Sequence, residues 1–133
     1  MPAPDATTLF DFADQIALIS TEVLRFRLRN RPRLSDVDKQ QLEAAEMRLD
    51  ELTAQLRALG VEALGACTQA AQAEVEAATR EAEGLLRRLK RTERALQVAA
   101  SVVDLAVAAV TRQPTQIGVA LRGVRSALQG GSV

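Results

Sequence analysis

The sequence predicts an all-α protein, built as a long antiparallel helical hairpin or coiled-coil-like bundle of about four helices. Three observations predict it. Ala, Leu, Glu, Arg and Gln dominate the chain. Pro occurs only at positions 2, 4, 32 and 114, and neither Asn-Gly nor Asp-Gly, the strongest hairpin signals, is present. With 133 residues, of which 47% are hydrophobic, we expect a single domain, 1–133, that buries its own core.

The first helix is expected over about residues 6–30. Thr8 followed three residues later by Asp11 gives a capping-box-like start, and Pro32 ends the segment. Apolar residues spaced alternately three and four apart predict its core face: Leu9, Phe12, Ile16, Ile19, Val23 and Phe26. Further apolar residues widen this face to about half of the circumference, so more than one neighbouring helix must cover it.

The second helix is expected over about residues 36–59, with Ser35 as its N-cap. One narrow heptad stripe carries its apolar side chains: Leu42, Ala45, Leu49, Leu52, Leu56 and Leu59. Gly60 stands where a C′ glycine would end the helix, and we favour a turn there. The alternative is one continuous helix through Gly60, because a straight helix can absorb the phase shift of the stripe beyond it.

The third helix is expected over about residues 66–111, since heptad spacing continues from Ala71 to Val110. Pro114 suits the first turn of a fourth helix, over about residues 114–128, which is followed by a tail over 129–133. Gly118 and Gly123 weaken this last helix in isolation, so we expect it to depend on packing.

Residues 95–110 are almost entirely apolar, except for Gln97, Ser101 and Asp104 on one helical line that Arg94 and Thr111 extend. We favour a central helix of the bundle whose polar stripe meets solvent or pairs with a basic neighbour. The alternative is a membrane-surface hairpin formed by this segment and the basic helix over 112–128. Spanning is disfavoured, because sixteen residues cover about 24 Å of a hydrocarbon core of roughly 30 Å.

Arginines gather before Pro32 and again before the apolar segment, and these side chains are candidates for contact with anions or a membrane. The candidates are Arg25, Arg29, Arg87, Arg88, Arg91, Arg112, Arg122 and Arg125. The simpler interpretation is that cations oppose a helix dipole and that Arg27 and Arg31 reach acids on neighbouring helices. Balanced charge, with 17 basic and 17 acidic residues, and the absence of Trp and Tyr argue against nucleic-acid binding.

Neither catalysis nor metal binding is predicted. The chain has no His, which removes the usual general base near neutral pH, and its one Cys, Cys67, cannot form an intrachain disulfide. We therefore expect no enzyme activity, no cofactor and no metal. The first residues lack the basic and apolar regions of a signal peptide, so we expect a cytoplasmic protein, with peripheral membrane association as the alternative.

The expected function is that of a non-enzymatic protein–protein interaction module, such as a scaffold, adaptor, chaperone or inhibitor. Apolar heptad seams that one thin hairpin cannot cover would bind a second copy or a helical protein partner. The predicted interface residues are Leu42, Leu49, Leu52, Leu56, Leu96, Val103 and Val110. The alternative function is that of a membrane-surface protein that uses residues 95–110 and 112–128.

Overall fold

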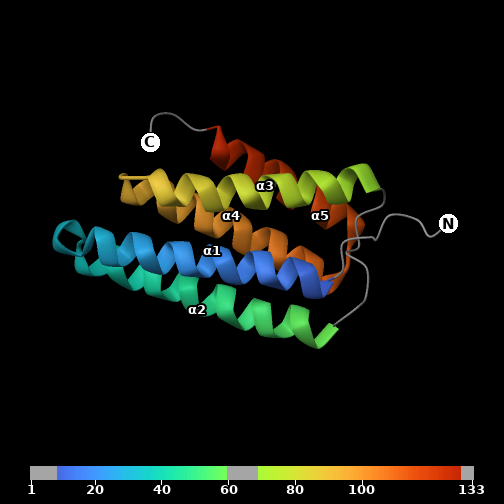
Figure 1. The fold of residues 1–133 in the computed structure, drawn as a ribbon, viewed down its shortest axis with the longest axis horizontal. Helices are drawn as coiled ribbons and strands as arrows, with labels where there is room; N and C mark the ends of the chain where they lie inside the picture. The colour runs from blue at the N-terminus through green and yellow to red at the C-terminus, as the bar shows by residue number, and fades with distance from the viewer. Residues whose placement is uncertain (1–8, 60–68, 130–133) are drawn as a thin grey trace.

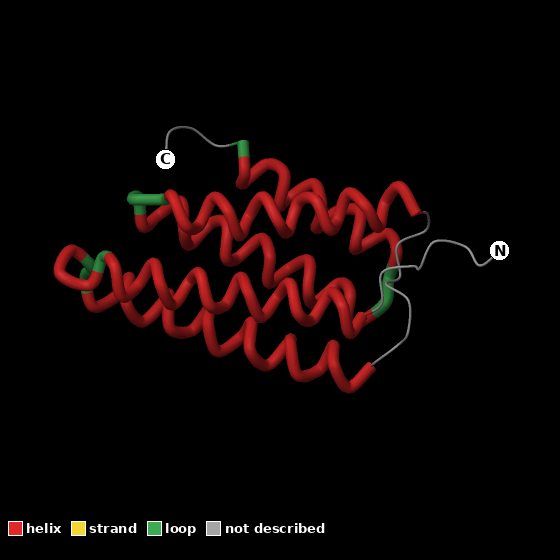
Figure 2. The backbone as a smooth tube through the Cα atoms, viewed as in Figure 1, coloured by secondary structure: helices red, strands yellow, loops and turns green. Residues whose placement is uncertain are grey.

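The computed structural model describes residues 9–59 and 69–129, which contain five α-helices and a short 3-10 turn but no strand. In chain order these are α1 (Leu9–Arg29), the 3-10 turn η1 (Arg31–Arg33), α2 (Asp36–Leu59), α3 (Gln69–Arg88), α4 (Thr92–Thr111) and α5 (Pro114–Leu128). Figure 2 shows long helices, with short loops at the ends of the bundle between α1 and α2, between α3 and α4, and between α4 and α5. The all-α fold class is confirmed.

The helices lie side by side and reverse direction along the chain (Figure 1). Around the bundle the packed neighbours are α1 with α2, α2 with α4, α4 with α5, α5 with α3, and α3 with α1. In addition, α4 contacts α1 and α3, so it packs against every other described helix. The apolar segment predicted to be a central helix therefore occupies the centre of the bundle.

The core face predicted for the first helix is confirmed, because all six of its seam residues are fully buried in α1. The helix begins at Leu9 within the described residues and ends at Arg29, after which Asn30 Nδ2 donates to the carbonyl of Phe26. Pro32 then lies in η1. The expected start near residue 6 and the cap at Thr8 lie outside the described residues.

The second helix has the predicted bounds, since the Asp38 N–H donates to Ser35 Oγ at 3.1 Å, as an N-cap requires. The helices on either side of residues 60–68, α2 and α3, run in opposite directions (Figure 1). Gly60, where the turn was expected, lies with residues 60–68 outside the described part of the chain.

The single third helix over 66–111 is wrong, because the chain breaks between α3 and α4 at residues 89–91. Arg91 has an extended conformation, and the Ala95 N–H bonds the Arg91 carbonyl to begin a new helix. No Gly or Pro marks this break. Folding back allows α4 to be buried among four helices, and this packing outweighs the local helix propensity of the segment. Five helices therefore replace the predicted four.

The last helix begins at Pro114 and ends at Leu128, as predicted. Arg112 closes α4 in a left-handed conformation with φ of 54°, and its N–H bonds the carbonyls of Ala108 and Ala109. This is the C′ position that glycine usually takes. Packing supports α5 through buried Ile117, Leu121 and Val124.

The inward orientation of α2 gives a first prediction. Leu49→Ala should lower the free energy of unfolding by about 2–5 kcal/mol, because the fully buried Leu49 would leave a cavity. Met47→Ala is the matched control and should change it by less than about 0.5 kcal/mol, because Met47 is 65% exposed. Denaturant unfolding followed by far-ultraviolet circular dichroism measures both. Equal losses would contradict this orientation of α2.

Candidate interaction surfaces

The predicted interface residues on α2 are core residues of the single chain. Leu42, Leu49, Leu52 and Leu56 are all at most 1% exposed. The narrow heptad stripe is covered within the chain by α1 and α4, the two helices that pack against α2. The expectation that these four leucines face a partner is therefore corrected, because α1 and the folded-back α4 supply the cover that a thin hairpin lacks.

The predicted interface residues on α4 have a different position. Leu96, Val103 and Val110 are only partly buried, at the edge of the core. Their spacing of seven residues places them in one line along the helix. Ala100 is exposed between the first two, and Val107 is half-buried beside the last two. An apolar row thus remains open to solvent along α4, which we call the open face of α4: Leu96, Ala100, Val103, Val107 and Val110.

A groove of about 530 Å³ lies between α4 and α5. Ser101 and Asp104 line it from α4, and Gln116 and Val119 line it from α5. Ser101 Oγ donates back to the Val98 carbonyl, whereas Asp104 is exposed. The polar stripe predicted for residues 95–110 therefore meets solvent at this groove, as the favoured interpretation expected.

Arg94 departs from that stripe. Its side chain is buried, with 7% of the residue exposed, and Nη1 donates to the Ala127 carbonyl at 2.5 Å. Ala127 lies in the last turn of α5, where carbonyls have no partner within the helix. Arg94 thus caps α5 and fastens its end to the start of α4, so it has a structural role instead of extending the solvent-facing line.

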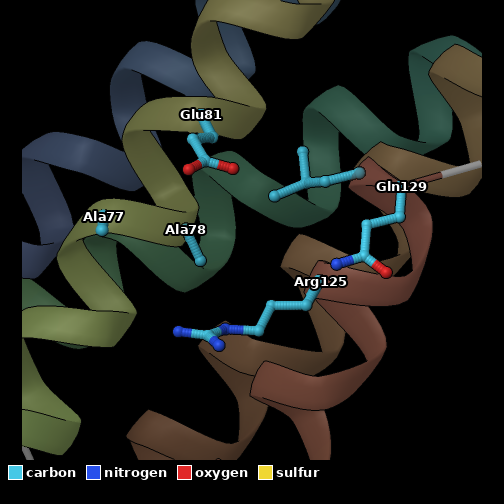
Figure 3. Close-up of a pocket in the computed structure, with 6 residues that line it drawn as sticks. Ala77, Ala78, Glu81, Arg125 and Gln129 are labelled. Atoms are coloured by element: carbon cyan, nitrogen blue, oxygen red, sulfur yellow. The ribbon is translucent and has the colours of Figure 1, made fainter.

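A smaller pocket of about 220 Å³ lies between α3 and α5 (Figure 3). Ala77, Ala78 and Glu81 line it from α3, whereas Arg125 and Gln129 line it from the end of α5. Arg125 pairs with Glu74 at 3.4 Å, and both side chains are about half exposed. This arrangement links two helices and brings together no set of groups suited to catalysis.

Arg27 ties α1 to α2. Its Nε donates to Glu46 Oε2 at 2.6 Å, and Nη1 lies 3.7 Å from Glu43. The hydrogen bond to Glu46 raises the pKa of Arg27, outweighing the lowering by burial, and the charges of Glu46 and Glu43 raise it further. Because folding raises the pKa of Arg27, the pairing of Arg27 with Glu46 stabilises the folded protein at every pH below the ordinary arginine pKa. This stabilisation is lost only as the pH rises through the raised pKa. The simpler interpretation of this arginine is supported.

Arg25 and Arg87 converge on a buried carboxylate that ties α1 to α3. Glu22 is 2% exposed, and its Oε2 accepts from Arg25 at 3.1 Å and from Arg87 at 2.9 Å. The hydrogen bond to Glu22, followed by the charge of Glu83, raises the pKa of Arg87. Oε1 of Glu22 accepts no hydrogen bond from any described residue. These two arginines therefore have partners within the fold.

Arg29 brings together two arginine clusters that are far apart in sequence. Its Nη2 donates to the Leu86 carbonyl at 3.0 Å and to the Leu89 carbonyl at 3.5 Å, at the end of α3. The guanidinium also lies 5.6 Å from the ring centroid of Phe26. The α1–α2 connection and the α3–α4 turn therefore lie at the same end of the bundle (Figure 1). We call residues 25–34 and 87–91 together the basic end.

The sequence identified both clusters but missed their meeting, because it predicted one unbroken helix through the second cluster. Had the break after α3 been known, the parallel course of α1 and α3 would have placed the two clusters at the same end. Arg88 and Arg91, two of the candidate anion contacts, are exposed there. Arg112, Arg122 and Arg125 lie elsewhere, on the α4–α5 turn and along α5.

The described residues contain no group of three or more His, Cys, Asp and Glu that could hold a metal ion. One described helix, Thr92–Thr111, is long and apolar enough to cross a membrane by length and composition, with a mean hydropathy of 1.5. Half of that window is buried inside the protein, and the core helix of a bundle passes the same test.

The contacts of Arg29 give a second prediction. Arg29→Leu should make the backbone amides over 86–95 exchange with solvent about five- to tenfold faster, because the carbonyls of Leu86 and Leu89 lose a charged donor. Arg31→Leu is the control, since Arg31 forms no side-chain hydrogen bond with a described residue. Native-state hydrogen exchange measures both variants, and equal acceleration would refute the capping role of Arg29.

The chain matches no protein-family model, no curated protein and no solved structure. The features that bear on its function are thus the two surfaces described above, the open face of α4 and the basic end.

Proposed function

We propose that this chain is a non-enzymatic protein–protein interaction module that self-associates through the open face of α4. One observation carries the proposal: the central helix leaves a line of partly buried apolar side chains, Leu96, Val103 and Val110, at the surface. Apolar rows of this spacing are typical of helix–helix interfaces. The partner in this proposal is a second copy of the same chain.

The order of residues along the row favours a two-fold partner. Leu96 and Val110 lie at equal distances in sequence on either side of Val103. When two copies of α4 pack antiparallel about a two-fold axis at Val103, Leu96 of each copy meets Val110 of the other. A two-fold interface requires this kind of self-complementary surface. Small Ala100 within the row allows the two backbones to approach closely.

The neighbouring helix α2 would enlarge this interface. A stable dimer usually buries about 800 Å² on each copy, which exceeds what one helix face supplies. Beside α4, α2 adds the partly buried Ala45 and Leu59. The interface would therefore combine α4 with the adjoining edge of α2, whereas the buried leucines of α2 support it from beneath.

The non-enzymatic part of the proposal rests on chemistry. The sequence has no His, which is the usual base that activates a serine nucleophile. Among the described serines, Ser20 donates to a carboxylate, Asp50 Oδ1, at 2.7 Å, but Ser20 itself is only 6% exposed and the bond joins α1 to α2. Cytoplasmic residence remains a prediction.

The alternative function, membrane-surface association through residues 95–110 and 112–128, takes second place. Nine residues of α4 are buried by the other helices, so only its outer side would reach lipid. On α5, Val119 is 51% exposed and Arg122 is exposed, which supports a surface contact of limited area. Self-association would cover the whole open face of α4, which is why we place it before membrane-surface association.

The two-fold model gives a third prediction. Val103→Asp should convert a dimer, with twice the 14.3 kDa chain mass, into a monomer, because two carboxylates would face each other at the two-fold axis. Size-exclusion chromatography with light scattering and refractive-index detection measures the mass, since the chain lacks Trp and Tyr for ultraviolet detection.

Met47→Asp provides the control, because Met47 is exposed on α2 and carries the same type of change. This variant should remain a dimer. A monomeric wild-type protein at high concentration, or a dimer that Val103→Asp leaves intact with its helicity unchanged, would disprove self-association through α4.

A further inference from the structure

The basic end concentrates positive charge that is balanced elsewhere in the chain. Residues 25–34 and 87–91 contain nine of the 17 basic side chains and none of the 17 acidic ones. The hydrogen bonds from Arg29 to the end of α3 hold the two segments together. A protein of zero formal net charge therefore presents a strongly cationic surface at one end.

Some of these cations have partners within the fold and others do not. Arg25, Arg27 and Arg87 pair with glutamates, as described above. Arg31, Arg88, Lys90 and Arg91 are exposed and form no ion pair with any residue that the structure describes. Arg33 is also exposed, and donates only to the neutral Asn30. Five cations are thus directed to solvent from two neighbouring connections.

Exposed aliphatic side chains accompany these cations. Leu28, in the last turn of α1, is 54% exposed, and Val37, in the first turn of α2, is 62% exposed. They are two of the five large hydrophobic residues that the described surface exposes. Pro32 is exposed between them, and Leu34 is partly buried. An apolar phase that covered these aliphatic groups would gain the free energy of removing them from water.

We propose that the basic end docks onto an anionic phospholipid surface. Arg31, Arg88 and Arg91 would bind lipid phosphates, for which the planar guanidinium is suited. Leu28 and Val37 would enter the boundary between head groups and acyl chains. Cationic clusters bearing a few exposed apolar residues bind membranes in this way, through charge attraction together with apolar burial.

The apolar component favours lipid over nucleic acid. Exposed Leu28 and Val37 gain nothing from a phosphate backbone, and the described surface of the basic end has no exposed aromatic side chain on which bases could stack, because Phe26 is buried. Asp36, Asp38 and Glu93 flank the patch and reduce its charge only in part. This docking site shares no residue with the open face of α4, so the two proposals can fail separately.

Vesicle flotation of the full chain tests the proposal. Vesicles of phosphatidylcholine with phosphatidylserine should carry the protein, whereas vesicles of phosphatidylcholine alone should not. Binding should weaken as salt is raised. Because each cation near an anionic surface contributes roughly a fivefold factor, the triple variant Arg88→Gln/Lys90→Gln/Arg91→Gln should partition about 100-fold more weakly.

The matched control is Arg48→Gln/Arg57→Gln/Arg80→Gln, which removes the same charge from exposed positions outside the basic end. It should bind the anionic vesicles as the wild type does. A third variant, Leu28→Ser/Val37→Ser, keeps the charge and should weaken binding by about tenfold. Circular dichroism verifies that each variant retains its helicity.

Three outcomes would overturn the docking of the basic end, and a fourth would overturn its apolar part. The first is no flotation with phosphatidylserine vesicles, or equal flotation with both vesicle types. The second is equal loss in the two triple variants, which would assign binding to overall charge. The third is binding to duplex DNA in a gel-shift assay in preference to vesicles, which would make nucleic acid the ligand. Unchanged binding of Leu28→Ser/Val37→Ser would refute the insertion of apolar side chains.

Discussion

The burial of α4 is the constraint on which the rest of the structure depends. Its sequence is apolar on most sides, and water cannot solvate such a helix without a large free-energy cost. Packing against all four other helices buries nine of its residues, most of them Val, Leu and Ala. Small alanines at these positions allow four neighbours to approach one helix, which larger side chains would prevent. The five-helix arrangement follows from this need for cover.

The same constraint explains the polar features at the helix ends. For α4 to lie among the other helices, the chain must reverse after α3, and the reversal leaves carbonyls at the end of α3 without helical partners. Arg29 from α1 donates to two of them. At the end of α5, Arg94 performs the same task for the carbonyl of Ala127. Arg29 thus stabilises the turn that central burial of α4 requires, and Arg94 fastens the end of α5 to the start of α4.

Local signals predicted those parts of the fold that depend on one helix alone. The seam of α1, the Ser35 cap and the start of α5 at Pro114 each follow from residues within a single turn or heptad repeat. The break at residues 89–91 does not, because no Gly or Pro marks it and only packing between distant helices favours it. That one missed reversal also concealed the basic end and left the α2 leucines as apparent interface residues. Sequence periodicity shows which face is apolar, but not which neighbour covers it.

The positions of the two proposed surfaces have a geometric consequence. The open face of α4 runs along the bundle, whereas the basic end lies where α4 begins, next to Thr92. Antiparallel pairing about Val103 would therefore place the two basic ends at opposite ends of the dimer. A flat membrane could engage only one of them, and the other would remain free for a second anionic surface. A dimer built in this way would bring vesicles together, whereas a Val103→Asp monomer with an intact basic end would bind vesicles without clustering them, so light scattering by vesicle suspensions distinguishes the two geometries.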